Sequence, residues 1–218
     1  MNITQRKNIV ISQKIIEICP QFQFAALQCE VQNFLTSDAL WNEILAESER
    51  IKVNFKLEEI NKRPAILATR QAYKALGKDP NRYRPSAEAL CRRIVRDLPL
   101  YRTTALVDII NLVSIRSGFS IGGFDADKIA GNQLTLGVGT ASDEFEAIGR
   151  GLLNIEHLPV YRDEMGGIGT PTSDCERTKI SPETTNLLML INAYSGEEGL
   201  QEAVDFAKKL LEKYATIQ

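Results

Sequence analysis

Three polar side chains recur at every third position of an otherwise apolar segment. Asp108, Asn111 and Ser114 lie within residues 104–116, whose other members are mostly Leu, Ile and Val. If the segment is a helix, the three fall on one narrow stripe, and the apolar residues around them indicate that the helix is buried. A buried polar group without a partner costs about 1–3 kcal/mol. The stripe therefore either braces the protein's own backbone or meets a ligand in a cavity.

Two further segments have residue types that suit ligand binding. The pair Gly122-Gly123 permits close backbone approach, and we expect either a tight turn or the wall of a pocket there. Residues 163–183 form a long polar segment that contains Asp163, Asp174 and Arg177. Loops of this length are uncommon in compact domains and are usually functional or flexible.

The sequence contains few other side chains that could act in catalysis. His157 is the single histidine, so a serine triad or a multi-histidine zinc site lacks its partners. The cysteines are too dispersed for a metal or redox motif, and no phosphate-loop or dinucleotide-binding glycine pattern occurs. We therefore expect no metal, no cofactor, and a cytoplasmic protein with reduced thiols. No apolar run approaches the ~20 residues of a membrane helix.

The charge of the chain is unevenly distributed. The net charge is -2, yet residues 62–102 contain eleven Lys and Arg against three acids, with tyrosines between them. Such a mixture suits phosphates and stacked bases; a pair of solvated basic helices is the alternative. The cations that we select as contacts to an anionic partner are Arg84, Arg92, Arg93 and Arg96.

The hydrophobic periodicity predicts an α+β fold. Strands are expected at residues 9–12, 23–31, 134–138, 153–161 and 185–193. Helices are expected from Ser37, at 57–76 with a break near Pro64, at 86–96 with Ser86 as the cap, at 103–117 and at 197–214. Residues 15–18 fit either a strand or one helical turn. Because strands and helices come in blocks, a doubly wound nucleotide fold is not expected.

Four segments in this order resemble the B3/B4 domain of the phenylalanyl-tRNA synthetase beta chain, most closely its free-standing members. They are DPNRYRPSAEALCRR (79–93), LVDIINLVS (106–114), GGFDADKIAG (122–131) and DCERTKISPETTN (174–186). The resemblance implies a B3/B4-domain-like α+β fold, with a barrel-like β core and helices packed around it. It implies one domain over residues 1–218, comprising a loosely matched N-terminal β/α part (1–56), a core (57–195) and a C-terminal helix (196–218).

In the synthetase this domain hydrolyses tyrosine wrongly esterified to tRNA. By this resemblance and the patterns above, we predict catalytic roles for Asn111, Asp108 and Gly122, and tRNA contacts for the four arginines named above. The residues predicted to bind substrate are Ser114, Gly123, Asp163, Asp174 and Arg177. The implied partner is aminoacyl-tRNA; the oligomeric state stays open.

The chain departs from the synthetase pocket at two positions, because Ile110 replaces a threonine and Gly122 a histidine. The glutamate that reads the tyrosine hydroxyl has no secure counterpart. An aminoacyl ester is already activated, so a positioned water and backbone donors at the glycine pair suffice for hydrolysis. We therefore predict a deacylase that acts in trans on mischarged tRNA and prefers a smaller or aliphatic amino acid to tyrosine. The alternative is a non-catalytic module that binds tRNA or a small amino-acid-like ligand.

Overall fold

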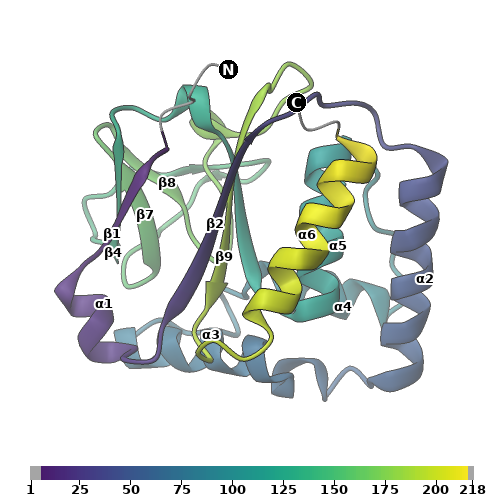
Figure 1. Cartoon of the computed structure of the whole chain (residues 1–218). Coiled ribbons are helices and arrows are strands. Elements are labelled where there is room, and N and C mark those ends of the chain that lie inside the picture. Colours follow the sequence, from purple (N-terminus) through teal and green to yellow (C-terminus); the bar gives the residue numbers. More distant parts are fainter. Residues whose placement is uncertain (1–5, 216–218) are drawn as a thin grey trace.

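A three-stranded antiparallel sheet forms the middle of the molecule. The computed structural model describes residues 6–215, and its central sheet has the order β2 (Gln23–Glu30), β9 (Asn186–Ala193) and β3 (Ser120–Asp125). Figure 1 shows this sheet between a second sheet on one side and the helices on the other. β3 has only β9 as a neighbour within its sheet, so its other edge is free to contact loops.

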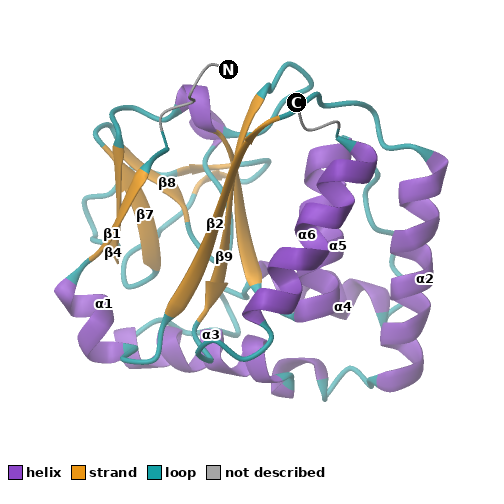
Figure 2. Ribbon diagram, in the orientation of Figure 1, coloured by secondary structure: helices purple, strands orange, loops and turns teal. Residues whose placement is uncertain are grey.

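The second sheet has four strands in the order β1 (Asn8–Ile11), β4 (Gln133–Val138), β7 (Pro159–Asp163) and β8 (Gly166–Gly169). β1 runs parallel to β4, and the other pairs are antiparallel. A two-stranded ribbon of β5 (Glu146–Ala147) and β6 (Gly151–Leu152) completes the strands of the described residues. Figure 2 shows the two larger sheets as separate layers of strands.

Strand β9 joins the two halves of the core because all eight of its residues are buried. Alternate side chains of a strand point to opposite faces. Leu188 and Leu190 pack against the four-stranded sheet, whereas Met189 and Ile191 pack against the helices. The apolar run NLLMLINA therefore serves two cores at once, as expected for a strand that is covered on both faces.

Six α-helices are described: α1 (Gln13–Ile18), α2 (Asp38–Asn54), α3 (Pro64–Leu76), α4 (Ser86–Ile94), α5 (Ala105–Ser117) and α6 (Leu200–Tyr214). Helices α5 and α6 lie beside the central sheet, with α2 outside them (Figure 1). Short 3₁₀ turns occur at η1 (Ile60–Lys62), η2 (Ala126–Lys128) and η3 (Glu176–Thr178). None of the helices within residues 6–215 combines the length and apolarity needed to cross a membrane.

The helix ends follow the sequence signals. Ser37 caps α2 by accepting a hydrogen bond from the Leu40 N–H over 3.2 Å. Gly77 ends α3 and Gly118 ends α5, each with a positive φ that favours glycine. Ser86 is the exception: it is the first residue of α4, and Pro85 holds the cap position without a side-chain bond.

The α+β class is confirmed, and the β core consists of two open sheets with helices packed around them, without closure into a barrel in the described part. Of the two alternatives for Gly122-Gly123, the tight turn is wrong, since both glycines lie inside β3. The segment 163–183 is not a structureless loop, because it contains β8 and η3. The strand predicted at 153–161 begins only at Pro159, and residues 15–18 are helical.

Candidate functional site

A cavity of about 420 Å³ opens between α5 and β3, within the ~300–1,000 Å³ range of small-molecule sites. Its apolar walls come mainly from Leu90, Val107, Ile110, Ile121 and Ile180. The polar groups that line it are Ser86, Thr103, Thr104, Asn111, Ser114, Thr170, Ser173, Asp174 and Lys179. An apolar cavity with a few convergent polar groups is typical of a site that orients a small ligand.

Two members of the polar stripe line this cavity. Asn111 is half-buried, and its side-chain amide has no hydrogen-bond partner within residues 6–215. An amide offers two N–H donors and one acceptor, so Asn111 is free to contact a ligand. Ser114 is buried, and its hydroxyl donates to the Phe119 carbonyl over 2.7 Å. Ser114 therefore supports the cavity wall rather than presenting an unpaired donor.

Asp108 has a different environment from the other two stripe residues. It is fully buried and does not line the cavity. Its carboxylate accepts hydrogen bonds from the Thr36 hydroxyl, and from the backbone N–H and hydroxyl of Thr103 at 3.0 Å each. Asp108 thus ties the start of α5 to the segment that precedes α2, which is the bracing alternative for this position.

The two glycines of β3 have distinct roles. Gly123 lines the cavity, and a Cβ there would lie 2.3 Å from Cδ1 of Ile110 on α5. Gly122 faces the opposite side of the strand and is not a cavity residue; its Cβ would lie 2.7 Å from the Phe124 ring. Gly123 therefore permits the close approach of helix and strand, whereas Gly122 makes room for a core aromatic ring.

Asp174 closes the floor of the cavity. Its Oδ2 accepts the backbone N–H of Gly123 over 3.1 Å, and its Oδ1 has no partner among the described residues. A Cβ at Gly169 would lie 2.8 Å from Oδ1 and 2.5 Å from the Phe124 ring. The carboxyl therefore sits beside an aromatic ring in space that two glycines leave open.

This environment changes the acidity of Asp174. Burial raises the pKa of its carboxyl to about 7, although the hydrogen bond from Gly123 favours the charged form and partly opposes the rise. Part of Asp174 remains accessible through the cavity, even though the group is set deep in the protein. A carboxyl with a pKa near 7 can accept and return a proton at neutral pH.

A tight turn holds Asp174 in place. The Thr170 hydroxyl oxygen accepts the N–H groups of Thr172 and Ser173 over 3.2 and 3.1 Å, and the Thr170 N–H donates to the Ser173 carbonyl over 2.9 Å. Thr170, Ser173 and Lys179 line the cavity and were missed by the sequence analysis. The hydroxyl residues spaced three apart around Pro171 were the available signal, since such residues often build turns.

Asp163 and Arg177 lie together but are not among the cavity-lining residues. Two contacts of 2.8 Å join the guanidinium of Arg177 to the carboxylate of Asp163. Burial opposes ionisation of Asp163, but Arg177 and the N–H groups of Ala130 and Met165 hold its pKa below the ordinary value. The pair fixes the hairpin between β7 and β8.

The four predicted arginine contacts differ in exposure. Arg84 and Arg96 are exposed, whereas Arg92 is half-buried and donates to the Leu57 carbonyl over 3.3 Å. Arg93 donates to the Pro99 carbonyl and lies 4.9 Å from the centre of the Tyr101 ring. Tyr101 is 72% exposed, so it offers a face for stacking.

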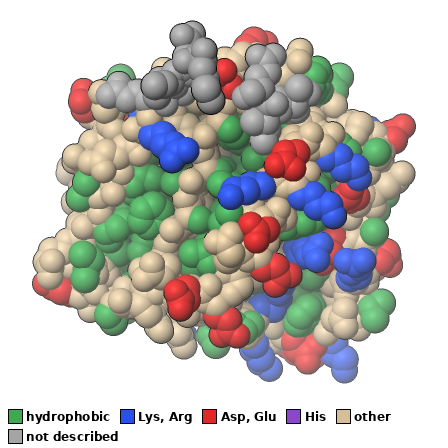
Figure 3. All heavy atoms as spheres, in the orientation of Figure 1, with side chains coloured by type: hydrophobic (Ala, Val, Ile, Leu, Met, Phe, Trp, Pro, Cys, Tyr) green, Lys and Arg blue, Asp and Glu red, His purple; other side chains and the backbone are tan. Residues whose placement is uncertain are grey.

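Part of the basic segment serves the fold. Arg63, Arg70 and Lys78 are buried, and Arg70 forms a 2.7 Å ion pair with the buried Glu88. On the face drawn in Figure 3, acidic and basic side chains mix over α2 and α6, and no uniformly basic area is seen there. The free cations of residues 62–102 are therefore fewer than the sequence count.

The family model of the B3/4 domain matches residues 68–216, and the chain belongs to this family, which confirms the resemblance. Among solved structures, the chain is similar to an N-terminal fragment of the phenylalanyl-tRNA synthetase beta-subunit from Pyrococcus horikoshii, with 15% identity and a TM-score of 0.51. That similarity covers 97% of this chain and 51% of the fragment, so the chain spans about half of its relative's length. No match was found among curated proteins.

Within residues 6–215, no group of three or more His, Cys, Asp or Glu side chains is placed to hold a metal ion.

Proposed function

We propose that the protein binds the amino-acid-bearing end of charged tRNA in the cavity between α5 and β3, and hydrolyses the ester of a wrongly attached amino acid. The observation that carries the proposal is the Asp174 carboxyl on the cavity floor, with Oδ2 held by Gly123 and Oδ1 unpartnered. Membership of the B3/4 domain family supports the choice of tRNA as the partner.

The proposed reaction uses one proton acceptor. Asp174 takes a proton from a water molecule, whose oxygen forms a bond to the carbonyl carbon of the ester. The bond between this carbon and the ribose oxygen then breaks, and the ribose oxygen receives the proton from Asp174. The products are a free amino acid and an uncharged tRNA, so the cycle needs no co-reactant. General acid–base catalysis of this kind contributes about 10²–10⁴-fold.

Asn111 supplies the second element of the proposal. Its amide has no partner among the described residues and faces the same cavity as Asp174. An amide N–H donor can stabilise the negative charge that develops on the carbonyl oxygen. Asn111 takes this role in place of the Gly123 N–H, which already donates to Asp174. The apolar wall around Ile110 and Ile121 suits a small or aliphatic amino acid.

The roles predicted for other residues are revised in this proposal. Asp108 becomes a positioning residue for α5, because its carboxylate is used within the protein. Gly122 acts through its neighbour Phe124, and the Asp163–Arg177 pair supports the hairpin outside the cavity.

One observation favours a second function. The Gly123 N–H is the expected backbone donor to an oxyanion, but it already donates to Asp174. This favours a cavity that binds tRNA or an amino-acid-like ligand without cleaving it. Incubation with tRNAs charged with wrong amino acids, with the wild type and Asp174→Asn, separates the two. Ester loss that depends on Asp174 supports hydrolysis, whereas tRNA binding without ester loss supports the binding module.

A further inference from the structure

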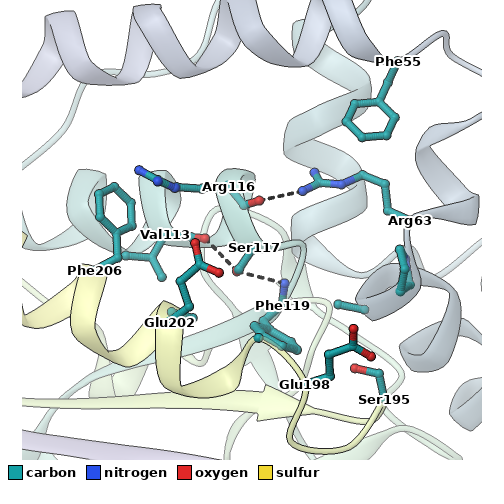
Figure 4. Close-up of a pocket in the computed structure, with 14 residues that line it drawn as sticks. Phe55, Arg63, Val113, Arg116, Ser117, Phe119, Ser195, Glu198, Glu202 and Phe206 are labelled. Carbon is teal, nitrogen blue, oxygen red and sulfur yellow. Dashed lines mark hydrogen bonds between the residues drawn. The ribbon is translucent and has the colours of Figure 1, made fainter.

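A second cavity, of about 330 Å³, lies along a different face of α5 from the candidate site. Figure 4 shows its lining: Val113, Arg116 and Ser117 come from α5, and Glu202 and Phe206 come from α6. The connection between β9 and α6 adds Ser195 and Glu198. Phe55, at the end of α2, and Arg63, directly before α3, complete the set. The volume lies within the ~300–1,000 Å³ range of small-molecule sites.

The walls of this cavity are largely apolar. Three aromatic rings, those of Phe55, Phe119 and Phe206, contribute to it from three separate segments. Val113 and Ala203 lie between them in the lining. Apolar surface that stays open to water is costly, and it favours a ligand that brings an apolar group of its own.

Charged groups of opposite sign line the same cavity without pairing. The Arg116 guanidinium lies 4.3 Å from the centre of the Phe206 ring and forms no ion pair within the described part of the chain. Glu198 and Glu202 likewise have no ion pair there. Arg63 differs, because its guanidinium is buried and donates to the carbonyls of Ile115 and Arg116. The available charges are therefore one cation and two carboxylates.

We infer that this second cavity binds a free α-amino acid with an apolar side chain. The ligand carboxylate pairs with Arg116, its ammonium group pairs with Glu202, and its side chain packs against the phenylalanine rings. A zwitterion with an apolar side chain uses all three features, whereas a simple amine leaves Arg116 unused and a simple acid leaves Glu202 unused. Charge-assisted hydrogen bonds of this kind are the stronger ones.

The inference does not rest on the proposed hydrolysis, because the two cavities lie along different faces of α5. Val113 lines the second cavity and Ser114 lines the first. A free amino acid is also a product of the proposed reaction and could enter the first cavity. The test must therefore distinguish the two locations, and the Asn111→Ala variant serves this purpose because Asn111 lines the first cavity only.

The test is isothermal titration calorimetry of the full chain with L-leucine and L-phenylalanine. The matched probes are isoamylamine, which lacks the carboxylate, and 4-methylpentanoate, which lacks the amine. The variants are Arg116→Gln and Glu202→Gln, and Glu197→Gln serves as the control because Glu197 is exposed and outside the lining. Circular dichroism melts confirm that each variant folds.

We expect an apolar amino acid to bind, and each of Arg116→Gln and Glu202→Gln to weaken it by about tenfold or more. Glu197→Gln and Asn111→Ala should leave the affinity unchanged, and both one-charge probes should bind at least about tenfold more weakly. Absence of binding by both amino acids at millimolar concentration overturns the inference. So does binding that is lost in Asn111→Ala but retained in Arg116→Gln, or an amine that binds as tightly as the amino acid.

Discussion

The Gly123 N–H donates to Oδ2 of Asp174 over 3.1 Å, which joins the free edge of β3 to the turn that follows β8. The contact fixes one carboxyl oxygen, while the other has no partner among the described residues and lies beside Gly169 and the Phe124 ring. In the proposed reaction this carboxyl accepts and returns the proton, so no histidine is needed.

Asn111→Ala tests the amide that faces the cavity. We expect deacylation to slow by ~10–1000-fold, because an oxyanion donor of this kind contributes several kcal/mol. The affinity for tRNA should stay nearly unchanged, since Asn111 contacts the reacting end and not the phosphates. Single-turnover deacylation and filter binding measure the two quantities. Asn132→Ala, at an exposed position outside the cavity, is the matched control, and an equal loss in both variants would contradict the role of Asn111.

The pH dependence of stability tests the environment of Asp174. Its folded-state pKa of about 7 lies above the ~3.9 of an unfolded aspartate. Between these values the folded state binds more protons than the unfolded state, so this group lowers the free energy of unfolding as pH rises from about 4 to 7. Asp174→Asn keeps an acceptor for the Gly123 N–H and removes the ionisation. We expect the variant to gain about 1–3 kcal/mol over the wild type between pH 4 and 8.

Urea unfolding of both proteins at several pH values measures this difference. The other carboxyls with shifted pKa values, such as Asp143 and Asp163, are present in both proteins and cancel in the comparison. A difference that does not change with pH would show that Asp174 ionises with an ordinary pKa and would remove it as the proton acceptor.

Much of this site can be predicted from the sequence, including Asp174 as a substrate contact, but the proton-acceptor role proposed for Asp174 cannot. The stripe on 104–116 and the glycine pair do converge on one cavity, through Asn111, Ser114 and Gly123. Periodicity predicts which face a residue occupies, but it does not show that Thr36, distant in sequence, satisfies Asp108. The residue types at Gly122-Gly123 also mislead, because paired glycines suggest a turn. They lie instead inside a strand, where their lack of a side chain makes room for Phe124 and Ile110.

Charge counting has a similar limit. The number of cations in residues 62–102 predicts a basic surface. Arg70, however, is buried and paired with Glu88, which is one of only three acids in this segment. Whether a cation is exposed depends on helix packing between α3 and α4, which the local sequence does not fix. The exposed cations, such as Arg96, are those left for a partner.

The double variant Arg93→Gln with Arg96→Gln tests the proposed tRNA contact. Arg93 lies three residues after Leu90 of the cavity wall, so these two side chains lie on one side of α4. Arg96 follows the end of α4 and is exposed. We expect weaker binding to tRNA of any sequence, with a log–log salt slope reduced by roughly 0.7–0.9 for each lost phosphate contact. The control changes Lys14 and Lys208 to Gln, since both are exposed and lie outside this cavity. Equal affinity in the two double variants would exclude the α4 surface.

The most direct test charges several tRNAs with wrong amino acids and follows ester loss with the wild type and Asp174→Asn at pH 6, 7 and 8. We predict that the wild type accelerates hydrolysis of at least one ester of a small or aliphatic amino acid, and that the catalysed part rises as pH passes 7, where Asp174 loses its proton. Asp174→Asn should reduce that part by about 10²–10⁴-fold while tRNA affinity is unchanged. If the wild type never exceeds the uncatalysed rate on any charged tRNA, hydrolysis is contradicted and the cavity is a binding site only.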